Sequence, residues 1–296
     1  MLDGWRKDDE PVMKKLPVEV DIPEYLVKIG LAPEATEMMK ASGDLALVAY
    51  YYLLRIGEYT RGSSPRSAKK QTVDYRMRDV VFFGMDEYGG LKQISKEEPD
   101  EVIMTAQCAT LRLDNQKNGW RNVCVNHHHN GDDIFCPVRA LGRRYNHIRK
   151  RMQNNWNTPL STVWDEQGKK MHVTDKIIRQ GLKMAATVLE YPEHRGIPVE
   201  RIDTHSLRIG GANALHLAGY SDREIQKMGR WRSDTFKEYV REQLSNFSEG
   251  MSRSMSKKFE FVNIEGGVCH DISRTVMGME YNNGVTRGGS YGITQE

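Results

Sequence analysis

The spacing of apolar residues predicts an amphipathic helix between Asp44 and Gly57. Asp44 is a residue type that often caps helix N-termini, so we expect the helix to begin there. Arg55 lies near the expected C-terminal end, where Gly57 turns the backbone. The apolar positions fall at i, i+3, i+4, i+7, i+8 and i+11 and form one continuous face: Leu45, Val48, Ala49, Tyr52, Leu53 and Ile56.

Short β-rich runs in the middle of the chain predict strands at residues 79–83, 110–114 and 120–126. The last two runs flank a turn that contains Asn118-Gly119, a strong short-range signal for a β-hairpin. Lys117 stands on this turn.

From Pro137 onward, helical spacing returns and predicts a series of helices. We therefore expect an α+β fold that is mostly helical, with a small antiparallel sheet near the front. The first of these helices has an apolar face and many arginines. The signals for the others are Thr174 as a cap, Thr204 and Gly219 as the ends of the next helix, Ser221 with Glu224 as a capping box, and Ser233 or Asp234 as the start of a last helix that carries Phe236 and Tyr239.

The two ends of the chain lack this periodicity. Residues 1–34 contain four prolines with charges between them, so we expect a linker there. Residues 262–296 are rich in Gly and Asn, and we expect a disordered tail. The folded domain is then expected over residues 35–261.

The composition favours a soluble globular protein, with 39% hydrophobic and 28% charged residues. No apolar run approaches the roughly 20 residues that span a bilayer. Residues 1–15 carry charges and no apolar core of a secretory signal. The 4 cysteines are too few and too scattered for a disulfide framework, which favours a reducing compartment.

The distribution of charge is more informative than the net charge of +3. Residues 134–164 contain no Asp or Glu, and a stretch of one sign suits a polyanion such as DNA. An ordinary solvated helix face is the alternative. The cations that we predict to bind DNA are Arg139, Arg143, Arg144, Arg149, Lys150 and Arg151.

Three segments carry candidate chemistry: residues 54–59 (LRIGEY), residues 205–208 (HSLR), and residues 229–231 (GRW) followed by Tyr239. Together with Lys117 at a hairpin, their order and spacing resemble the active-site signature of the tyrosine recombinase (phage integrase) family. The resemblance extends from Asp44 to Ser248. The wording of "LLRIGEYT", "QKNG", "HSLRIGGANAL" and "GRWRSD" further resembles the recombinases of DIRS-type and Crypton-type eukaryotic transposons.

The resemblance implies an enzyme that cuts and rejoins DNA through a 3′-phosphotyrosine on Tyr239, with neither ATP nor metal. Negative charge develops on the non-bridging oxygens in the transition state, and fixed cationic donors stabilise it. The resemblance implies that Arg55 and Arg208 clamp these oxygens and that Lys117 is the general acid. It implies that His205 hydrogen-bonds the phosphate or helps to deprotonate the tyrosine, and that Trp231 donates its indole N–H to a phosphate oxygen. Glu58 would orient the arginine or the histidine.

Two positions leave alternatives open. The ten-residue spacing from Gly229 to Tyr239 places Arg230 at the His/Trp position of the family. The residue type found at that position in the family instead favours Trp231, which lies one residue later. The hairpin turn varies in length across the family, so Lys92 and Lys96 are alternatives to Lys117.

A zinc site is a competing interpretation of a cluster in the middle of the chain. Cys124, Cys136 and the histidines at 127–129 have the composition of such a site, although their spacing matches no finger. We expect no metal.

The expected partner is double-stranded DNA, bound by a homo-oligomer, a tetramer on DNA, with no membrane and no small-molecule substrate. The expected location is the nucleus in a eukaryote and otherwise the cytoplasm. Residues 1–34 would be a linker or the remnant of the family's N-terminal DNA-clamping domain. The alternatives are a DNA-binding protein that keeps the fold without cutting, and a topoisomerase-like enzyme.

Overall fold

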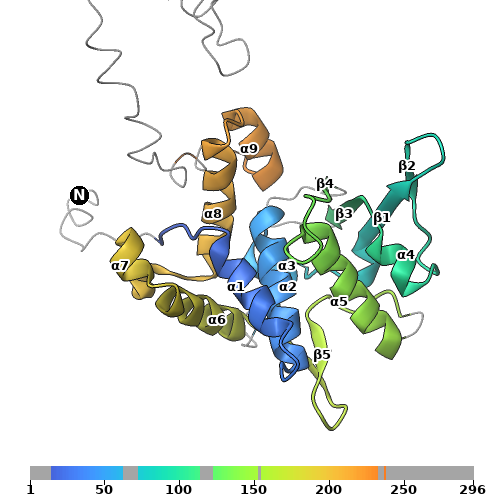
Figure 1. The fold of residues 1–296 in the computed structure, drawn as a ribbon, viewed down its shortest axis with the longest axis horizontal. Coiled ribbons are helices and arrows are strands. Elements are labelled where there is room, and N and C mark those ends of the chain that lie inside the picture. Colours follow the sequence, from blue (N-terminus) through green and yellow to red (C-terminus); the bar gives the residue numbers. More distant parts are fainter. Residues whose placement is uncertain (1–14, 63–72, 114–122, 153–154, 233–236, 238–296) are drawn as a thin grey trace, which may run out of the picture.

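The computed structural model describes residues 15–62, 73–113, 123–152, 155–232 and 237. The described chain is α+β and mostly helical, with a small antiparallel sheet, as the sequence predicts. In Figure 1, α6 and α7 lie on one side of α1 and α2, while α5 and the sheet lie on the other. The longer helices are α1 (Asp21–Gly30), α2 (Glu37–Tyr51), α5 (Pro137–Arg151), α6 (Asp175–Val188), α8 (Thr204–Leu217) and α9 (Asp222–Gly229). The short ones are α3 (Ile56–Tyr59), α4 (Asp100–Met104) and α7 (Tyr191–Arg195), with 3₁₀ turns at Met77–Asp79 and Val199–Arg201.

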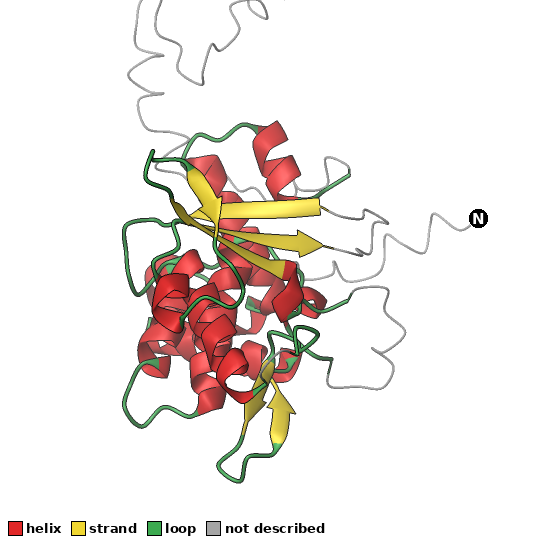
Figure 2. Cartoon of the chain, turned by 90° about the vertical axis from the view of Figure 1, so that its right-hand side faces the viewer, coloured by secondary structure: helices red, strands yellow, loops and turns green. Residues whose placement is uncertain are grey.

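The larger sheet has the strand order β2-β1-β3-β4, and each neighbouring pair is antiparallel. Leu111 pairs with Val125 in the register of β3 and β4, so the predicted hairpin is confirmed. Its turn, which contains Lys117, lies outside the described residues. A second hairpin, which the sequence did not predict, projects from the far end of the helical body, away from this sheet (Figure 2). The strands are β1 (Val80–Met85), β2 (Leu91–Gln93), β3 (Cys108–Leu113), β4 (Val123–His128), β5 (Thr162–Trp164) and β6 (Lys170–His172).

The start of α2 differs from the prediction. The helix begins at Glu37, and Thr36 is its N-cap, with Oγ1 accepting a hydrogen bond from the Met39 N–H at 3.2 Å. Asp44 lies in the middle of α2, is buried, and accepts hydrogen bonds from Arg143 at 2.8 and 2.6 Å. The prediction of Asp44 as a cap was wrong because its partner is 99 residues away in sequence.

Helix α1 forms in a region where we expected a linker. Pro23 lies in its first turn, where a backbone N–H has no intrahelical partner, so proline is tolerated. Ile22, Leu26 and Val27 are buried in the core shared with α2. At Gly43, a Cβ would lie 2.5 Å from the Leu26 carbonyl oxygen, so glycine permits the close contact of α1 with α2. Residues 21–30 are therefore part of the folded domain.

The C-terminal helices begin close to their predicted caps. Thr174 caps α6, and Ser221 with Glu224 forms the capping box of α9. The N-cap of α8 is Asp203, one residue before the predicted Thr204. The predicted helix with Phe236 and Tyr239 lies outside the described residues, as does the tail at 262–296. No helix among the described residues has both the length and the apolarity needed to cross a bilayer.

Candidate active site

The predicted catalytic residues Arg55, His205, Arg208 and Trp231, with Glu58 and Arg230, meet at the C-terminal end of α2. The chain leaves this helix through Leu53, which is in the left-handed region with φ 48°, and continues into Arg55, the N-cap of α3. The last carbonyls of a helix have no intrahelical partner, and cations are favoured beside them. Here the Leu53 carbonyl accepts hydrogen bonds from Arg208 of α8 and from Arg230, which follows α9, and the Tyr52 carbonyl accepts one from Arg230.

Two adjacent glycines bring α8 against this helix end. A Cβ on Gly210 would lie 1.9 Å from the Val18 carbonyl oxygen, and one on Gly211 would lie 2.3 Å from the Tyr50 carbonyl oxygen. Any larger side chain would push α8 away. The pair therefore sets the distance over which Arg208 reaches the Leu53 carbonyl, and sequence reasoning gave these glycines no role.

Arg208 is enclosed by protein, with a relative exposure of 1%. Its Nη1 donates to the Leu53 carbonyl and its Nη2 to the Gly229 carbonyl. The ring of Trp231 lies 4.2 Å from the guanidinium carbon, a cation–π contact. A Cβ on Gly229 would lie 1.5 Å from this ring, so glycine is required for Trp231 to fold back over Arg208.

Arg230 is also enclosed, with an exposure of 0%. Its backbone is in the left-handed region, with φ 58°, at the end of α9. Its Nη1 donates to the Tyr52 carbonyl at 3.3 Å, and its Nη2 donates to the Leu53 carbonyl at 3.1 Å and to Glu58 Oε2 at 2.9 Å. The Arg230 side chain thus lies against Glu58 and the end of α2.

Glu58 joins Arg230 to Arg55. Its side chain has an exposure of 0% and accepts hydrogen bonds from the Arg55 backbone N–H at 2.8 Å and from Arg55 Nη1 at 3.2 Å. The side chain of Arg55 is 22% exposed, which makes it more accessible than Arg208 or Arg230. We call these four residues, Arg55, Glu58, Arg208 and Arg230, the arginine cluster; three positive charges and one negative charge leave a net charge of +2.

His205 lies in the first turn of α8, half-buried beside the arginine cluster. Burial lowers its pKa to about 4, and the charges of Arg208 and Arg55 act in the same direction. Asp203 acts in the opposite direction, but this carboxylate also binds Arg179 at 3.0 Å. The imidazole is therefore neutral near pH 7 and, in the free protein, a weaker base than an ordinary histidine.

The predicted nucleophile Tyr239 and the predicted acid Lys117 lie outside the described residues. Lys237, two residues before Tyr239, pairs with Asp222 at the start of α9, at 3.3 Å. Of the alternative lysines, Lys92 is exposed on β2, and Lys96 donates to the Arg78 carbonyl at 3.4 Å.

Two of the six predicted DNA-binding cations are buried. Arg144 donates to the Leu160 and Thr162 carbonyls, and burial lowers its pKa to about 10. Arg139 donates to the Ala106 carbonyl at 2.8 Å. In this structure neither side chain could reach a phosphate without leaving these partners.

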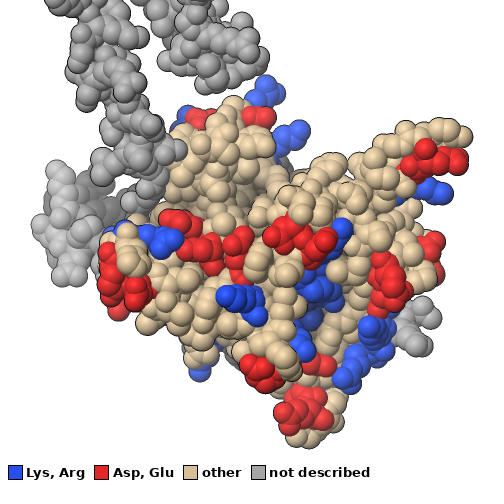
Figure 3. Space-filling model, viewed as in Figure 1, with Lys and Arg blue, Asp and Glu red and all other residues tan. Residues whose placement is uncertain are grey.

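The other four cations of this stretch lie beside carboxylates from other segments. Figure 3 shows cationic and acidic atoms next to one another along α5. Residues 134–164 carry only positive charges in the sequence, but in the folded structure acidic residues of other segments lie beside them. The most exposed are Lys150 and Arg151, with side-chain exposures of 71% and 49%. The ion pairs are Arg143–Asp44, Arg149–Asp100, Lys150–Asp100 and Arg151–Glu37. DNA contact by this stretch stays a prediction.

The candidate zinc ligands are not brought together among the described residues, where no three His, Cys, Asp or Glu side chains are placed to hold a metal ion. His127 Nε2 lies 2.7 Å from the Tyr51 carbonyl oxygen, and its ring packs on Tyr52. Cys124 is exposed on β4, whereas Cys136 is buried before α5.

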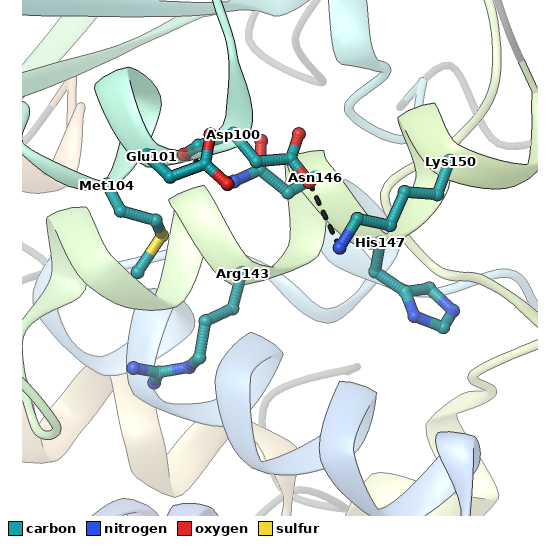
Figure 4. Close-up of a pocket in the computed structure, with 7 residues that line it drawn as sticks. All are labelled: Asp100, Glu101, Met104, Arg143, Asn146, His147 and Lys150. Carbon is teal, nitrogen blue, oxygen red and sulfur yellow. Dashed lines mark hydrogen bonds and ion pairs between the residues drawn. The ribbon is translucent and has the colours of Figure 1, made fainter.

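A groove of about 600 Å³ lies between α4 and α5 and shares no residue with the arginine cluster (Figure 4). Its charges are mixed, and Lys150 Nζ pairs there with Asp100 at 3.1 Å. The lining residues are Asp100, Glu101, Met104, Arg143, Asn146, His147 and Lys150.

No family model and no curated protein matches the chain. Among solved structures, the chain is similar to the XerA recombinase, with 15% identity and a TM-score of 0.45, over 85% of this chain and 67% of that one. It is similar to the XerH site-specific recombinase bound to its difH substrate, with 14% identity and a TM-score of 0.44, over 83% of this chain and 56% of that one. A third is the Tn1549 transposon integrase in complex with transposon right end DNA, with 14% identity and a TM-score of 0.39, over 84% of this chain and 68% of that one. The chain thus spans about two thirds of XerA and of the integrase fragment and just over half of XerH.

Proposed function

We propose that the chain is the catalytic domain of a tyrosine recombinase, which cleaves DNA strands and rejoins them through a 3′-phosphotyrosine intermediate on Tyr239. The observation that carries the proposal is the arginine cluster, which gathers residues of two separate sequence motifs at one helix end with a net charge of +2.

An excess of buried positive charge is costly unless an anion compensates it. A phosphodiester supplies one negative charge, and additional charge develops on its oxygens as the nucleophile attacks. Fixed donors in an enclosed site stabilise that charge more than they would in water, because the local dielectric is low. The cluster is therefore suited to the transition state of phosphoryl transfer.

The reaction assigns one role to each group. The hydroxyl oxygen of Tyr239 attacks phosphorus, the bond from phosphorus to the 5′-oxygen breaks, and that oxygen takes a proton from Lys117. The proton of the tyrosine passes to His205, whose pKa of about 4 in the free protein the negative charge of the bound phosphate would raise. Arg55 holds a non-bridging oxygen. Attack by a 5′-hydroxyl on the phosphotyrosine reverses these steps and rejoins a strand.

Arg208 contributes to this site only after a local change. Its donors now bind the carbonyls of Leu53 and Gly229, and Trp231 lies over its guanidinium. Contact of Arg208 with a phosphate requires Trp231 to move from the guanidinium. Trp231 would then present its indole N–H to the same phosphate.

This enclosure favours a second candidate function, a DNA-binding protein that keeps the fold without cutting. In that protein Arg208 would serve only to join α8, α9 and the end of α2. The two functions differ in covalent chemistry and share an affinity for DNA.

The finer assignments follow from the sequence resemblance. We propose double-stranded DNA as the partner, a homotetramer assembled on it, and a role in mobilising a transposon of the DIRS or Crypton type. Such an element would place the protein in the nucleus.

The test is incubation of the full chain with nicked double-stranded suicide DNA in excess EDTA. A nick near the cleavage site releases a short oligonucleotide and traps the enzyme on the 3′ end. We expect a protease-sensitive protein–DNA adduct. DNA binding without an adduct would support the non-cutting protein, and relaxation of supercoiled DNA without strand exchange would indicate a topoisomerase. Loss of the adduct in EDTA and recovery with magnesium would contradict the metal-independent mechanism.

A further inference from the structure

Arg230 has no role in the proposed reaction, yet its side chain hydrogen-bonds the Tyr52 and Leu53 carbonyls and Glu58. It stands where the family's spacing places a phosphate-contacting His or Trp. Its guanidinium is turned inward, has no exposed surface, and lies 2.9 Å from Glu58. A side chain enclosed in this way does not face a phosphate bound beside Arg55.

The contacts of Arg230 use the shape of a guanidinium. Nη1 and Nη2 reach the neighbouring carbonyls of Tyr52 and Leu53, and Nη2 also reaches Glu58. Arginine carries five N–H donors in a rigid planar fork, whereas the donors of lysine radiate from one nitrogen. The backbone of Arg230 is held in the left-handed region, which is uncommon for a residue with a side chain. This conformation ends α9 and turns the side chain toward the end of α2.

These contacts connect Arg230 to both arginines that the reaction uses. Glu58 lies between Arg230 and Arg55 and binds each guanidinium through a different carboxylate oxygen: Oε2 accepts from Arg230, and Oε1 from Arg55 Nη1. The Leu53 carbonyl accepts from Arg230 and from Arg208. Without Arg230, Glu58 would keep an ion pair with Arg55 alone. The end of α9 would also lose the side chain that hydrogen-bonds the carbonyls at the end of α2.

We propose that Arg230 is a positioning residue, which fixes Glu58 and through it the guanidinium of Arg55, and does not contact the phosphate itself. The proposal rests on the proposed function for its effect on cleavage. Its structural part concerns the placement of Arg55 and is tested without DNA.

The cleavage test is a double-mutant cycle with the full chain on nicked suicide DNA. Arg230→Lys keeps the charge and loses the fork, so we expect adduct formation to slow by about 10- to 100-fold, the order of effect of displacing a catalytic group. DNA affinity should change by less than about twofold, because the net charge that attracts phosphates is kept. In an Arg55→Ala background, Arg230→Lys should cause little further loss, since the group that it positions is gone. Rates that multiply in the double variant would instead indicate an independent contact with the phosphate and would overturn the proposal.

A matched control separates positioning from folding. Arg195 on α7 also binds two carboxylates, Glu19 and Asp21, and belongs to no proposed site. Arg195→Lys should leave the cleavage rate per folded molecule unchanged. If Arg230→Lys also leaves that rate unchanged and lowers only the melting temperature, Arg230 is merely structural and the proposal fails.

The second measurement is the titration of the His205 ring by NMR, in the free protein and in Arg230→Lys. Burial lowers the pKa of His205 most, and the charges of Arg208 and Arg55 lower it further, so part of this shift reports where their guanidiniums lie. If Arg230→Lys releases them, the pKa of His205 rises toward its ordinary value of 6.5. An unchanged pKa would show that both arginines keep their places without the fork of Arg230, which would overturn the proposal. This result stands even if wild-type protein forms no DNA adduct, in which case the proposed function fails and the positioning is judged by the titration alone.

Discussion

Glu58 is the only carboxylate of the arginine cluster, so its charge should contribute strongly to stability. Glu58→Gln keeps the volume of the side chain and removes one negative charge. Arg230, with an exposure of 0%, would then lose its ion pair with Glu58, and Arg55 would lose its own.

The expected magnitude follows from this burial. Removing one partner of a buried ion pair costs about 3–5 kcal/mol, because the other charge stays desolvated. Glutamine keeps one oxygen that can accept from Arg230, so we expect a loss near the lower limit, about 3 kcal/mol. That is a large part of the roughly 5–15 kcal/mol by which a typical domain is stable.

Urea unfolding at pH 7, followed by circular dichroism, measures the loss. With a denaturant slope of about 2 kcal/mol per molar, the midpoint should fall by about 1.5 M. Glu87→Gln is the matched control, because Glu87 is exposed in the turn between β1 and β2, and its loss should lie within about 0.5 kcal/mol. A loss below about 1 kcal/mol for Glu58→Gln would refute the reasoning, since it would mean that the cluster does not depend on this carboxylate.

Three further predictions concern other parts of the molecule. Gly210→Ala should lower the free energy of unfolding in urea by about 1–3 kcal/mol, because its Cβ would lie 1.9 Å from the Val18 carbonyl oxygen. The control Gly84→Ala, whose Cβ would have its nearest contact at 3.5 Å, should be close to neutral, and equal losses for the two variants would contradict the packing argument. The pKa of His205 is lowered to about 4 in the folded state, so the contribution of this neutral ring to stability is present above pH 6.5 and is lost as the pH falls from 6.5 to 4, where the unfolded chain takes up a proton first. His205→Gln should therefore flatten the fall in unfolding free energy over this pH range, and an unchanged slope would contradict the assignment. Lys150→Gln should reduce the slope of log DNA affinity against log salt by about 0.9 if Lys150 contacts one phosphate, whereas an unchanged slope would leave this exposed side chain to solvent.

The sequence predicted the features whose causes are local. The capping box of Ser221 and Glu224 and the cap at Thr174 depend on residues a few positions apart, and β3 pairs with the next strand along the chain. The structure also gathers Arg55, His205 and Arg208 at one helix end, and the roles predicted for them stay predictions.

Features that depend on distant partners could not be predicted in this way. Asp44 has the chemistry of a cap, and only the arrival of Arg143 from α5 shows why it is buried instead. Arg144 resembles a DNA-binding cation in a basic stretch, yet carbonyls near β5 enclose it. Arg230 stands at a position that suggests phosphate contact, and its inward turn follows from the left-handed backbone at the end of α9.

The adjacent glycines of α8 are a sequence signal for close backbone packing. Gly210 and Gly211 are adjacent inside a helix, where each glycine costs about 1 kcal/mol relative to alanine. Such a cost in a helix interior indicates that another backbone approaches closely, as the carbonyls of Val18 and Tyr50 do here.

The most direct test of the account is Tyr239→Phe on nicked suicide DNA. The change removes one hydroxyl and keeps the ring, so fold and DNA affinity should persist, with a loss of stability of at most about one hydrogen bond, roughly 0.5–1.5 kcal/mol. We predict that wild-type protein forms a covalent adduct, that mass spectrometry locates the DNA on Tyr239, and that the Phe variant forms none. An adduct that persists in the Phe variant, or that maps to another residue, would contradict the account.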